Sequence, residues 1–174
     1  IVVNGADANP IYGKQYWVQM GADIDGETQG DRAGRSVSLN ANGYIIAIGA
    51  AENTENGTRR GHTRVFQYRT VSSNEWSNYT YDSFLYNGTS PNNKPILVGG
   101  GDTTPVSGKF YWVQMGSDIY GEATDNWSGY SVSLSSNGTV VAIGATQNAG
   151  TSLISNDRRG HVRIYQYSTV SVIN

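Results

Sequence analysis

Two short motifs in this chain carry residue types that could do chemistry, and each occurs twice. The first, Asp-x-Asp-Gly-Glu at 23–27, places oxygen ligands at alternate positions, as loops that bind hard cations do. The second is Arg-Arg-Gly-His at 59–62 and again at 158–161. Its basic cluster could contact an anion or a glycan, and its histidine could act as a general base. Each motif therefore has a functional and a structural interpretation.

The second occurrence of the acidic motif argues against a calcium loop. There Asp25 is replaced by Tyr120, which leaves two carboxylates, Asp118 and Glu122. Calcium takes more oxygen ligands than that. We therefore interpret both stretches as turns in which Asp side chains cap backbone amides, and we expect no cofactor. Calcium binding is the alternative, with these candidate ligands: Asp23, Asp25, Glu27, Asp118 and Glu122.

The Arg-Arg-Gly-His motif is interpreted as the entry to a strand. Glycine takes a backbone angle that other residues resist, and we expect the arginines, His62 and His161 to project from a solvated face. Neither histidine has a Ser or Cys nucleophile beside it in the sequence. The nearest carboxylate pairs for glycosidase chemistry, Glu27 with Asp31 and Glu122 with Asp125, fall in turn-like sequence. We expect a protein that is not an enzyme, with a calcium-dependent hydrolase as a further alternative.

Composition narrows the classes of partner. The 174 residues include twelve basic and fourteen acidic side chains, so the chain lacks the positive charge of a nucleic-acid-binding protein. It contains no cysteine, which excludes disulfides and thiolate metal sites. No apolar run approaches the roughly 20 residues that a membrane helix needs, so we expect no membrane span.

Both motifs belong to an internal duplication. Residues 1–53 align without a gap to residues 96–148, and more than half of the aligned positions are identical. The second copy then has four extra residues before Arg-Arg-Gly-His. We therefore divide the chain into a first β repeat unit and a second unit that lacks the final segment of the first. The boundaries are 1–95, with a core at 17–71 and an extra strand segment at 75–95, and 96–174.

The pattern of apolar residues predicts an all-β fold. Strands are expected at 14–21, 34–40, 44–50 and 62–71, because short β-branched or aromatic runs there are bounded by Gly, Asn and Asp. In the second of these, Val37 and Leu39 alternate with serines, which is the period of a half-buried strand. The run at 44–50 is continuously apolar and should be a buried central strand. Asn-Gly, at 42–43 and 137–138, is expected to form the hairpin turns.

The repeated pattern also resembles a known family. A Gly-x-Ser-Val strand, an Asn-Gly turn, an apolar strand ending in Ile-Gly-Ala and a glycine-opened aromatic strand are similar to the FG-GAP-like repeat of integrin-type β-propellers. The resemblance covers 17–71 and 112–170. It implies two tandem antiparallel blade-like or sandwich-like β modules without significant helix. The calcium loop of the family is not carried over, because the matching turns contain no carboxylate, and closed propellers need at least four blades.

Further residues bear on decoration and recognition. Asn-x-Ser/Thr sequences, which are glycan acceptors in a secreted protein, occur at Asn56, Asn78, Asn87, Asn126 and Asn137. Aromatic residues that could stack on sugars are Tyr79, Tyr81, Trp127 and Tyr130. An integrin-propeller-like adhesion or glycan-binding module is therefore the alternative function.

The two ends of the sequence favour self-assembly. Both are apolar and strand-like, and we expect them to form the assembly contacts through Ile1, Val2, Val3, Val170, Val172 and Ile173. A terminal strand of one subunit would complete the unfinished sheet of the next, so that the partner is a second copy of the chain. The leading expectation is a non-enzymatic extracellular or cell-surface structural protein, glycosylated and built head to tail into a β-rich fibre or surface assembly.

Overall fold

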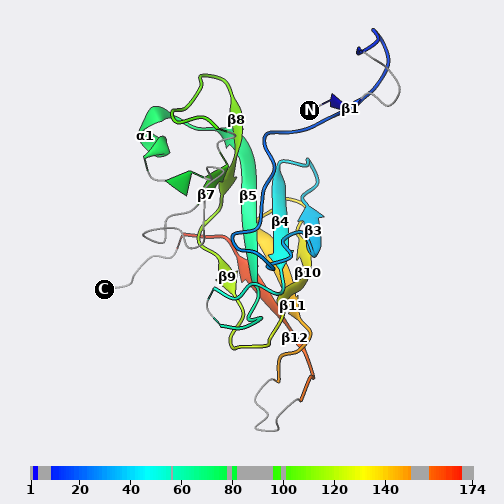
Figure 1. The fold of residues 1–174 in the computed structure, drawn as a ribbon, viewed down its shortest axis with the longest axis vertical. Coiled ribbons are helices and arrows are strands. Elements are labelled where there is room, and N and C mark those ends of the chain that lie inside the picture. Colours follow the sequence, from blue (N-terminus) through cyan, green and yellow to red (C-terminus); the bar gives the residue numbers. More distant parts are fainter. Residues whose placement is uncertain are drawn as a thin grey trace.

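A computed structural model describes residues 2–3, 9–55, 57–77, 80–81, 96–98, 101–149 and 157–169, and it is all-β as predicted (Figure 1). Its twelve strands are β1 (Val2–Val3), β2 (Trp17–Val18), β3 (Ser36–Leu39), β4 (Ile45–Ala50), β5 (His62–Thr70), β6 (Thr80–Tyr81), β7 (Ile96–Val98), β8 (Phe110–Gln114), β9 (Ile119–Tyr120), β10 (Ser128–Leu134), β11 (Val140–Ala145) and β12 (His161–Gln166).

Helix is nearly absent from the described residues. The short helix α1 (Ser73–Trp76) begins with a capping box between Ser72 and Glu75. No helix in the described part of the chain is long and apolar enough to cross a membrane.

The strands form three sheets. The largest has seven strands in the order β3-β4-β5-β8-β7-β6, with β9 also paired to β5. A second sheet has the order β10-β11-β12, and β1 and β2 form a separate two-stranded ribbon. All pairs are antiparallel except β6 with β7, which is parallel. Because β8 and β9 come from residues 96–174, the largest sheet combines strands from both copies of the repeat.

One of the three core clusters of the described residues lies between the two larger sheets. Ile45, Ala47 and Val65 of one sheet pack against Val141 and Ile143 of the other, with Val132 and Leu134 at the margin. This contact confirms that 44–50 is a buried central strand, since β4 lies between β3 and β5. The Asn-Gly pairs lie in the turns before β4 and β11, where Gly43 and Gly138 have positive φ angles.

Strand β3 alternates with period two, but in the opposite sense to the usual apolar-inside arrangement. Val37 is 60% exposed and Leu39 is 57% exposed. The serines instead face β10: the hydroxyl of Ser36 donates to the carbonyl of Gly129 (2.7 Å), and the amide of Leu134 donates to the hydroxyl of Ser38 (3.0 Å). The small serine side chains let the two sheets approach closely enough for these bonds.

Glycine makes the same close approach possible on β4. A Cβ atom at Gly49 would overlap the carbonyl oxygen of Gly129 on β10. The two copies therefore meet almost backbone to backbone at this point, which is possible only because neither residue has a side chain.

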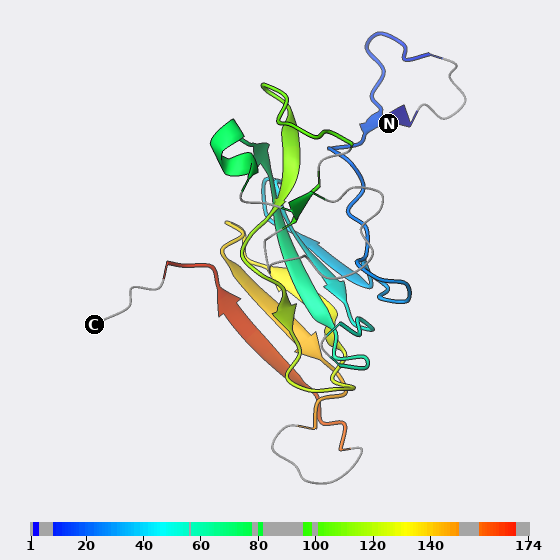
Figure 2. The ribbon, with the colours of Figure 1, turned by 60° about the vertical axis from the view of Figure 1, so that its left-hand side comes forward.

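Two elements lie at opposite ends of the molecule. Figure 2 shows β12 at the outer edge of its sheet, while β1 lies at the other end and away from both large sheets. Among the described strands, β12 pairs only with β11, and the β1–β2 ribbon pairs with nothing else. Each element thus has a free edge in the described part of the chain.

Candidate functional site

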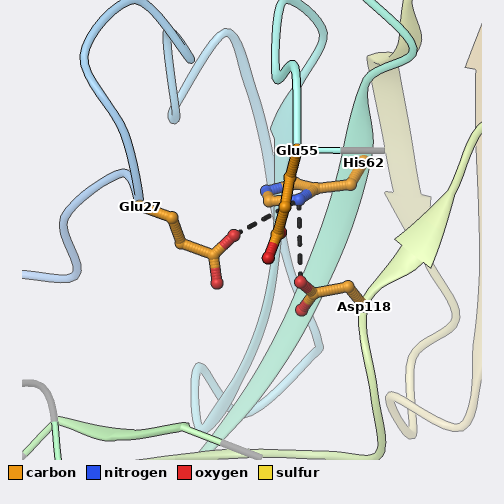
Figure 3. Close-up of side chains that lie close together, drawn as sticks. All are labelled: Glu27, Glu55, His62 and Asp118. Carbon is orange, nitrogen blue, oxygen red and sulfur yellow. Dashed lines mark ion pairs between the residues drawn. The ribbon is translucent and has the colours of Figure 1, made fainter. Parts of the chain in front are cut away.

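A buried cluster of ionisable groups lies where the two copies meet (Figure 3). One atom from each of Glu27, Glu55, His62 and Asp118 lies within 4.8 Å of the others. Glu27 and His62 are buried, whereas Glu55 and Asp118 are partly exposed. The site is thus closed on one side and reachable from the other.

The loop after β2 places Glu27. The carboxylate of Asp31 accepts hydrogen bonds from the backbone amides of Glu27 (3.1 Å) and Thr28 (2.9 Å). It also accepts one from the side-chain amide of Asn53 (3.0 Å), which ties the loop to the residues after β4. This side-chain cap stabilises a turn, as expected for the Asp-rich stretch, although the capping residue is Asp31.

Strand β5 supplies His62 and Arg64 from one face, because they are two residues apart. His62 is 0% exposed and Arg64 is 2% exposed. The guanidinium of Arg64 donates to the carbonyl of Asp25 (2.6 Å) and lies 3.7 Å from Oε1 of Glu27. The expectation that His62 projects from a solvated face is therefore wrong, because the loop at 22–33 and strand β9 cover this end of β5.

The second copy contributes Asp118 and Tyr120. Pairing of β9 with β5 sets Tyr120 opposite His62, and Asp118 precedes that strand. The side-chain amide of Gln114 donates to Asp118 (2.6 Å). The hydroxyl of Tyr120 lies 2.8 Å from Oε2 of Glu55 and 3.0 Å from Oδ2 of Asp118, and can donate to either.

Burial dominates the electrostatics of the cluster. It raises the pKa of Glu27 to about 8, against the opposing effect of the Arg64 guanidinium, and the carboxylates of Asp118, Glu55 and Asp31 raise it further. Burial likewise lowers the pKa of His62 to about 4, although Asp118 opposes this. It also raises the pKa of the Tyr120 phenol. Near neutral pH the imidazole is therefore uncharged, and Glu27 takes up a proton far more readily than an exposed carboxylate.

The polar atoms of the cluster are poorly satisfied. Oε2 of Glu27 and both ring nitrogens of His62 are buried and have no hydrogen-bond partner among the described residues. His62 therefore activates no Ser or Thr hydroxyl there, and the arrangement offers ligands rather than a nucleophile and base.

The second copy has a smaller version of this cluster. Glu122 lies 3.5 Å from Nδ1 of His161 and also pairs with Arg163. Asn126 takes the place of Asp31, accepting hydrogen bonds from the amides of Glu122 (3.1 Å) and Ala123 (2.9 Å). The side chains of His161 and Glu122 are 25% and 41% exposed, so this version is open to solvent.

The structure regroups the candidate metal ligands. It brings Glu27 and Asp118 together across the two copies and leaves Glu122 in the smaller cluster. Asp23 instead accepts a hydrogen bond from Gln19 (2.8 Å). Sequence reasoning missed Glu55 and His62 as members of one site. The recurrence of Glu27, His62 and Arg64 in the second copy was a signal for His62, whereas Glu55 has no counterpart there and gave no such signal.

The other candidate residues fall into three groups. Asn126 is buried, which leaves no room for a glycan, whereas Asn137 is exposed in the β10–β11 turn. The rings of Trp127 and Tyr130 are approached by the guanidinium groups of Arg59 (6.0 Å) and Arg35 (4.2 Å), so one face of each ring already has a cation near it. The candidates outside the described residues are Asn56, Asn78, Asn87 and Tyr79, and of Tyr81 only the backbone, in β6, is described.

Comparison with protein families, with curated proteins and with solved structures finds no match for this chain. The function is therefore argued from the geometry of the molecule.

Proposed function

We propose that the protein is a non-enzymatic structural subunit whose copies associate head to tail through strand addition, building a β-rich extracellular fibre or surface assembly. The observation that carries this is a contact inside the molecule whose two surfaces each occur a second time, unpaired, among the described strands. Inside the molecule, the β7–β8 ribbon of the second copy docks on β5 of the first. The β1–β2 ribbon of the first copy corresponds to β7–β8, and β12 of the second copy corresponds to β5. Both β1–β2 and β12 have a free edge in the described part of the chain.

The two ribbons have the same register. In β7–β8, Leu97 pairs with Val113 and Val98 with Trp112. In β1–β2, the duplicated residues pair in the same way, Val2 with Val18 and Val3 with Trp17. The β1–β2 ribbon therefore has the same strand pairing as the β7–β8 ribbon, which docks on β5.

Strand β12 offers the matching edge. Because β8 pairs with β5 from Phe66↔Gln114 to Thr70↔Phe110, the same register would place Gln19 of a second molecule opposite Tyr165 and its Trp17 opposite Tyr167. The backbone groups on both edges would then be satisfied by the ladder, as in other cases of strand addition.

The flat faces of the sheets support the same contact. Val65 on β5 is 8% exposed because the second copy covers it, whereas its counterpart Ile164 is 71% exposed. At the other end, Val37 and Leu39 are exposed, and their counterparts Val132 and Leu134 pack into the core between the sheets. One head-to-tail contact would bury both sets, and each buried aliphatic side chain contributes roughly 1.5–3 kcal/mol.

This geometry changes the expected donor strand. Of the terminal residues proposed to mediate assembly, Ile1, Val170, Val172 and Ile173 lie outside the described residues, and Val2 and Val3 are already paired in β1. The free edge of the ribbon belongs to β2, so we assign the donor role to residues 16–19. Such heterologous contacts propagate into filaments unless their rotation closes a ring.

Sedimentation velocity and negative-stain electron microscopy test the proposal. The wild-type protein is expected to grow in mass with concentration and to form fibres. Ile164→Lys places a charge in the contact and should leave a folded monomer. The matched control is Val106→Lys, which changes a residue that is 49% exposed and lies in the loop before β8, outside the contact. A wild-type chain that stays monomeric at every concentration would contradict the proposal, and a particle of fixed mass would replace the fibre by a ring.

A further inference from the structure

The cluster of Glu27, Glu55, His62 and Asp118 has the spacing of a ligand set. Nδ1 of His62 lies 3.6 Å from Oε2 of Glu27 and 3.7 Å from Oδ2 of Asp118. These separations are too long for hydrogen bonds. They match the distance of about 3.5 Å between neighbouring ligands of a tetrahedral zinc ion, whose bonds to nitrogen and oxygen are about 2.0–2.2 Å long.

The unpartnered atoms point to the same conclusion. Oε2 of Glu27 and the ring nitrogens of His62 have no hydrogen-bond partner among the described residues, although their side chains are only 4% and 1% exposed. A buried polar atom without a partner costs about 1–3 kcal/mol. A cation bound to Nδ1 and Oε2 would satisfy two of these atoms at once. We propose that this cluster binds one divalent transition-metal ion of the zinc type.

Charge balance favours a divalent ion. Three carboxylates face one another, and within the cluster only the guanidinium of Arg64 opposes them. Arg64 lies 3.7 Å from Oε1 of Glu27, so it leaves Oε2 free on the side of His62. A divalent cation would offset this excess of carboxylates over guanidinium groups, to which the nearby buried carboxylate of Asp31 adds.

The donor types select the metal. One imidazole nitrogen and up to three carboxylate oxygens suit zinc and its first-row neighbours, whereas calcium and magnesium prefer oxygen ligands alone and higher coordination numbers. The carboxylates are held from outside the ligand set, Asp118 by Gln114 and Glu55 by Tyr120, as ligands of metal sites usually are. Partial exposure of Glu55 and Asp118 supplies the entry path.

The ion would join the two copies of the repeat. Glu27, Glu55 and His62 belong to the first copy and Asp118 to the second, so binding would hold β9 against β5. The cluster around His161 lacks such a set, because residues 149–156 contain no carboxylate to match Glu55. We therefore expect one ion per chain, and stabilisation that grows with the logarithm of the zinc concentration.

Calorimetric titration of chelator-treated protein with zinc chloride tests the site. We expect one equivalent to bind and the melting temperature to rise, and cobalt(II) to give the visible absorption of a four-coordinate ion. Glu55→Gln and Asp118→Asn change ligands at the exposed rim, where folding should be retained, and each should weaken zinc binding at least about tenfold. The matched control is Glu122→Gln in the smaller cluster, which should bind zinc as the wild type does.

Three results would overturn the proposal: no binding to the wild-type protein, binding that survives both rim substitutions unchanged, or binding that Glu122→Gln abolishes equally. The titrations are made on the Ile164→Lys background as well. A failure of self-assembly then leaves the zinc measurement intact, because the four ligands belong to one chain.

Discussion

Strands β5 and β12 are built from the same repeated sequence but end in opposite environments. On β5, Thr63 is 0% exposed and Val65 is 8% exposed, whereas their counterparts on β12, Val162 and Ile164, are 67% and 71% exposed. The exposed residues of β12 are the more apolar members of each pair. What differs is the neighbour, because β8, β9 and the second sheet cover β5 while the outer edge of β12 has no strand beside it in the described chain. Whether a residue of this repeated strand is buried therefore depends on the contact between the repeat units and not on the residue type.

The β7–β8 and β1–β2 ribbons differ in exposure in the same way as β5 and β12 do. Trp112 on β8 is 7% exposed and Trp17 on β2 is 86% exposed, although both ribbons pair in the same register. The two tryptophans therefore differ in the neighbours that cover them and not in the strand pairing of the ribbon that holds them.

The largest expected effect separates the two tryptophans. The indole of Trp112 donates to the carbonyl of Met20 (2.8 Å) and packs on the ring of Tyr68. Trp112→Ala should lower the free energy of unfolding by about 3–5 kcal/mol. Trp17→Ala should change it by less than about 0.5 kcal/mol in dilute solution, because that side chain is exposed. Urea unfolding at a concentration where the chain is monomeric measures both values.

In self-association, by contrast, the exposed Trp17 should be the important tryptophan. Trp17→Ala is expected to weaken assembly, while Tyr12→Ala, at a residue that is 105% exposed, should not. Equal losses of unfolding free energy in Trp112→Ala and Trp17→Ala would contradict the prediction, because they would show that the two ribbons have equivalent environments.

Gly49 of the first copy and its counterpart Gly144 of the second have backbones in different environments. A Cβ at Gly49 would overlap the carbonyl oxygen of Gly129, whereas one at Gly144 would meet only the movable side chain of Ser131 and atoms of that residue at 3.7 Å and beyond. Gly49→Ala should therefore cost about 1–3 kcal/mol or more in thermal unfolding, and Gly144→Ala less than about 1 kcal/mol.

Gly144→Ala also reports on assembly. In a head-to-tail contact that repeats the internal one, Gly144 would face Gly34 of a second molecule as Gly49 faces Gly129. The variant should stay folded and monomeric in sedimentation velocity. If Gly144→Ala assembled as the wild-type protein does, the intermolecular contact would have to differ from the internal one.

Local patterns were enough to predict much of the fold. The all-β class, the strands β3, β4 and β5 and the Asn-Gly turns follow from short-range alternation and turn chemistry. So does the glycine before each histidine, since Gly61 and Gly160 have φ angles of 72° and 69°. Each of these features depends on residues that are close in sequence.

The candidate site depends on distant pairing instead. His62 is buried because β9, nearly sixty residues further along, pairs with β5 and because the loop at 22–33 covers its face. The inversion of β3 likewise follows from the approach of β10 to Ser36 and Ser38. A period of two shows that one face is packed, but the partner decides which face it is.

The smallest of the three differences in the free energy of unfolding concerns the response to pH. In the presence of a chelator, burial raises the folded pKa of Glu27 to about 8 from 4.5, so its contribution to stability is present below pH 4.5 and is lost as pH rises to 8. The folded pKa of His62 is lowered to about 4 from 6.5, so its contribution is present above pH 6.5 and is lost as pH falls. The two slopes oppose each other between pH 4.5 and 6.5. Above pH 6.5 only the effect of Glu27 remains, and the free energy of unfolding should fall by about 1–2 kcal/mol by pH 8.

Comparison of Glu27→Gln with Glu122→Gln isolates that fall. Glutamine resembles the protonated carboxyl group, so Glu27→Gln should match the wild type only below pH 4.5. It should already be the more stable protein at pH 6.5, and its advantage should widen up to pH 8 because its own stability stays level over that range. Glu122→Gln should keep the wild-type fall, because the Glu122 side chain is 41% exposed and lies outside the buried cluster. Urea unfolding at several pH values measures the three curves. A wild-type fall that persists in Glu27→Gln would assign the titration to another group and would show that burial of the first cluster does not set it apart from the second.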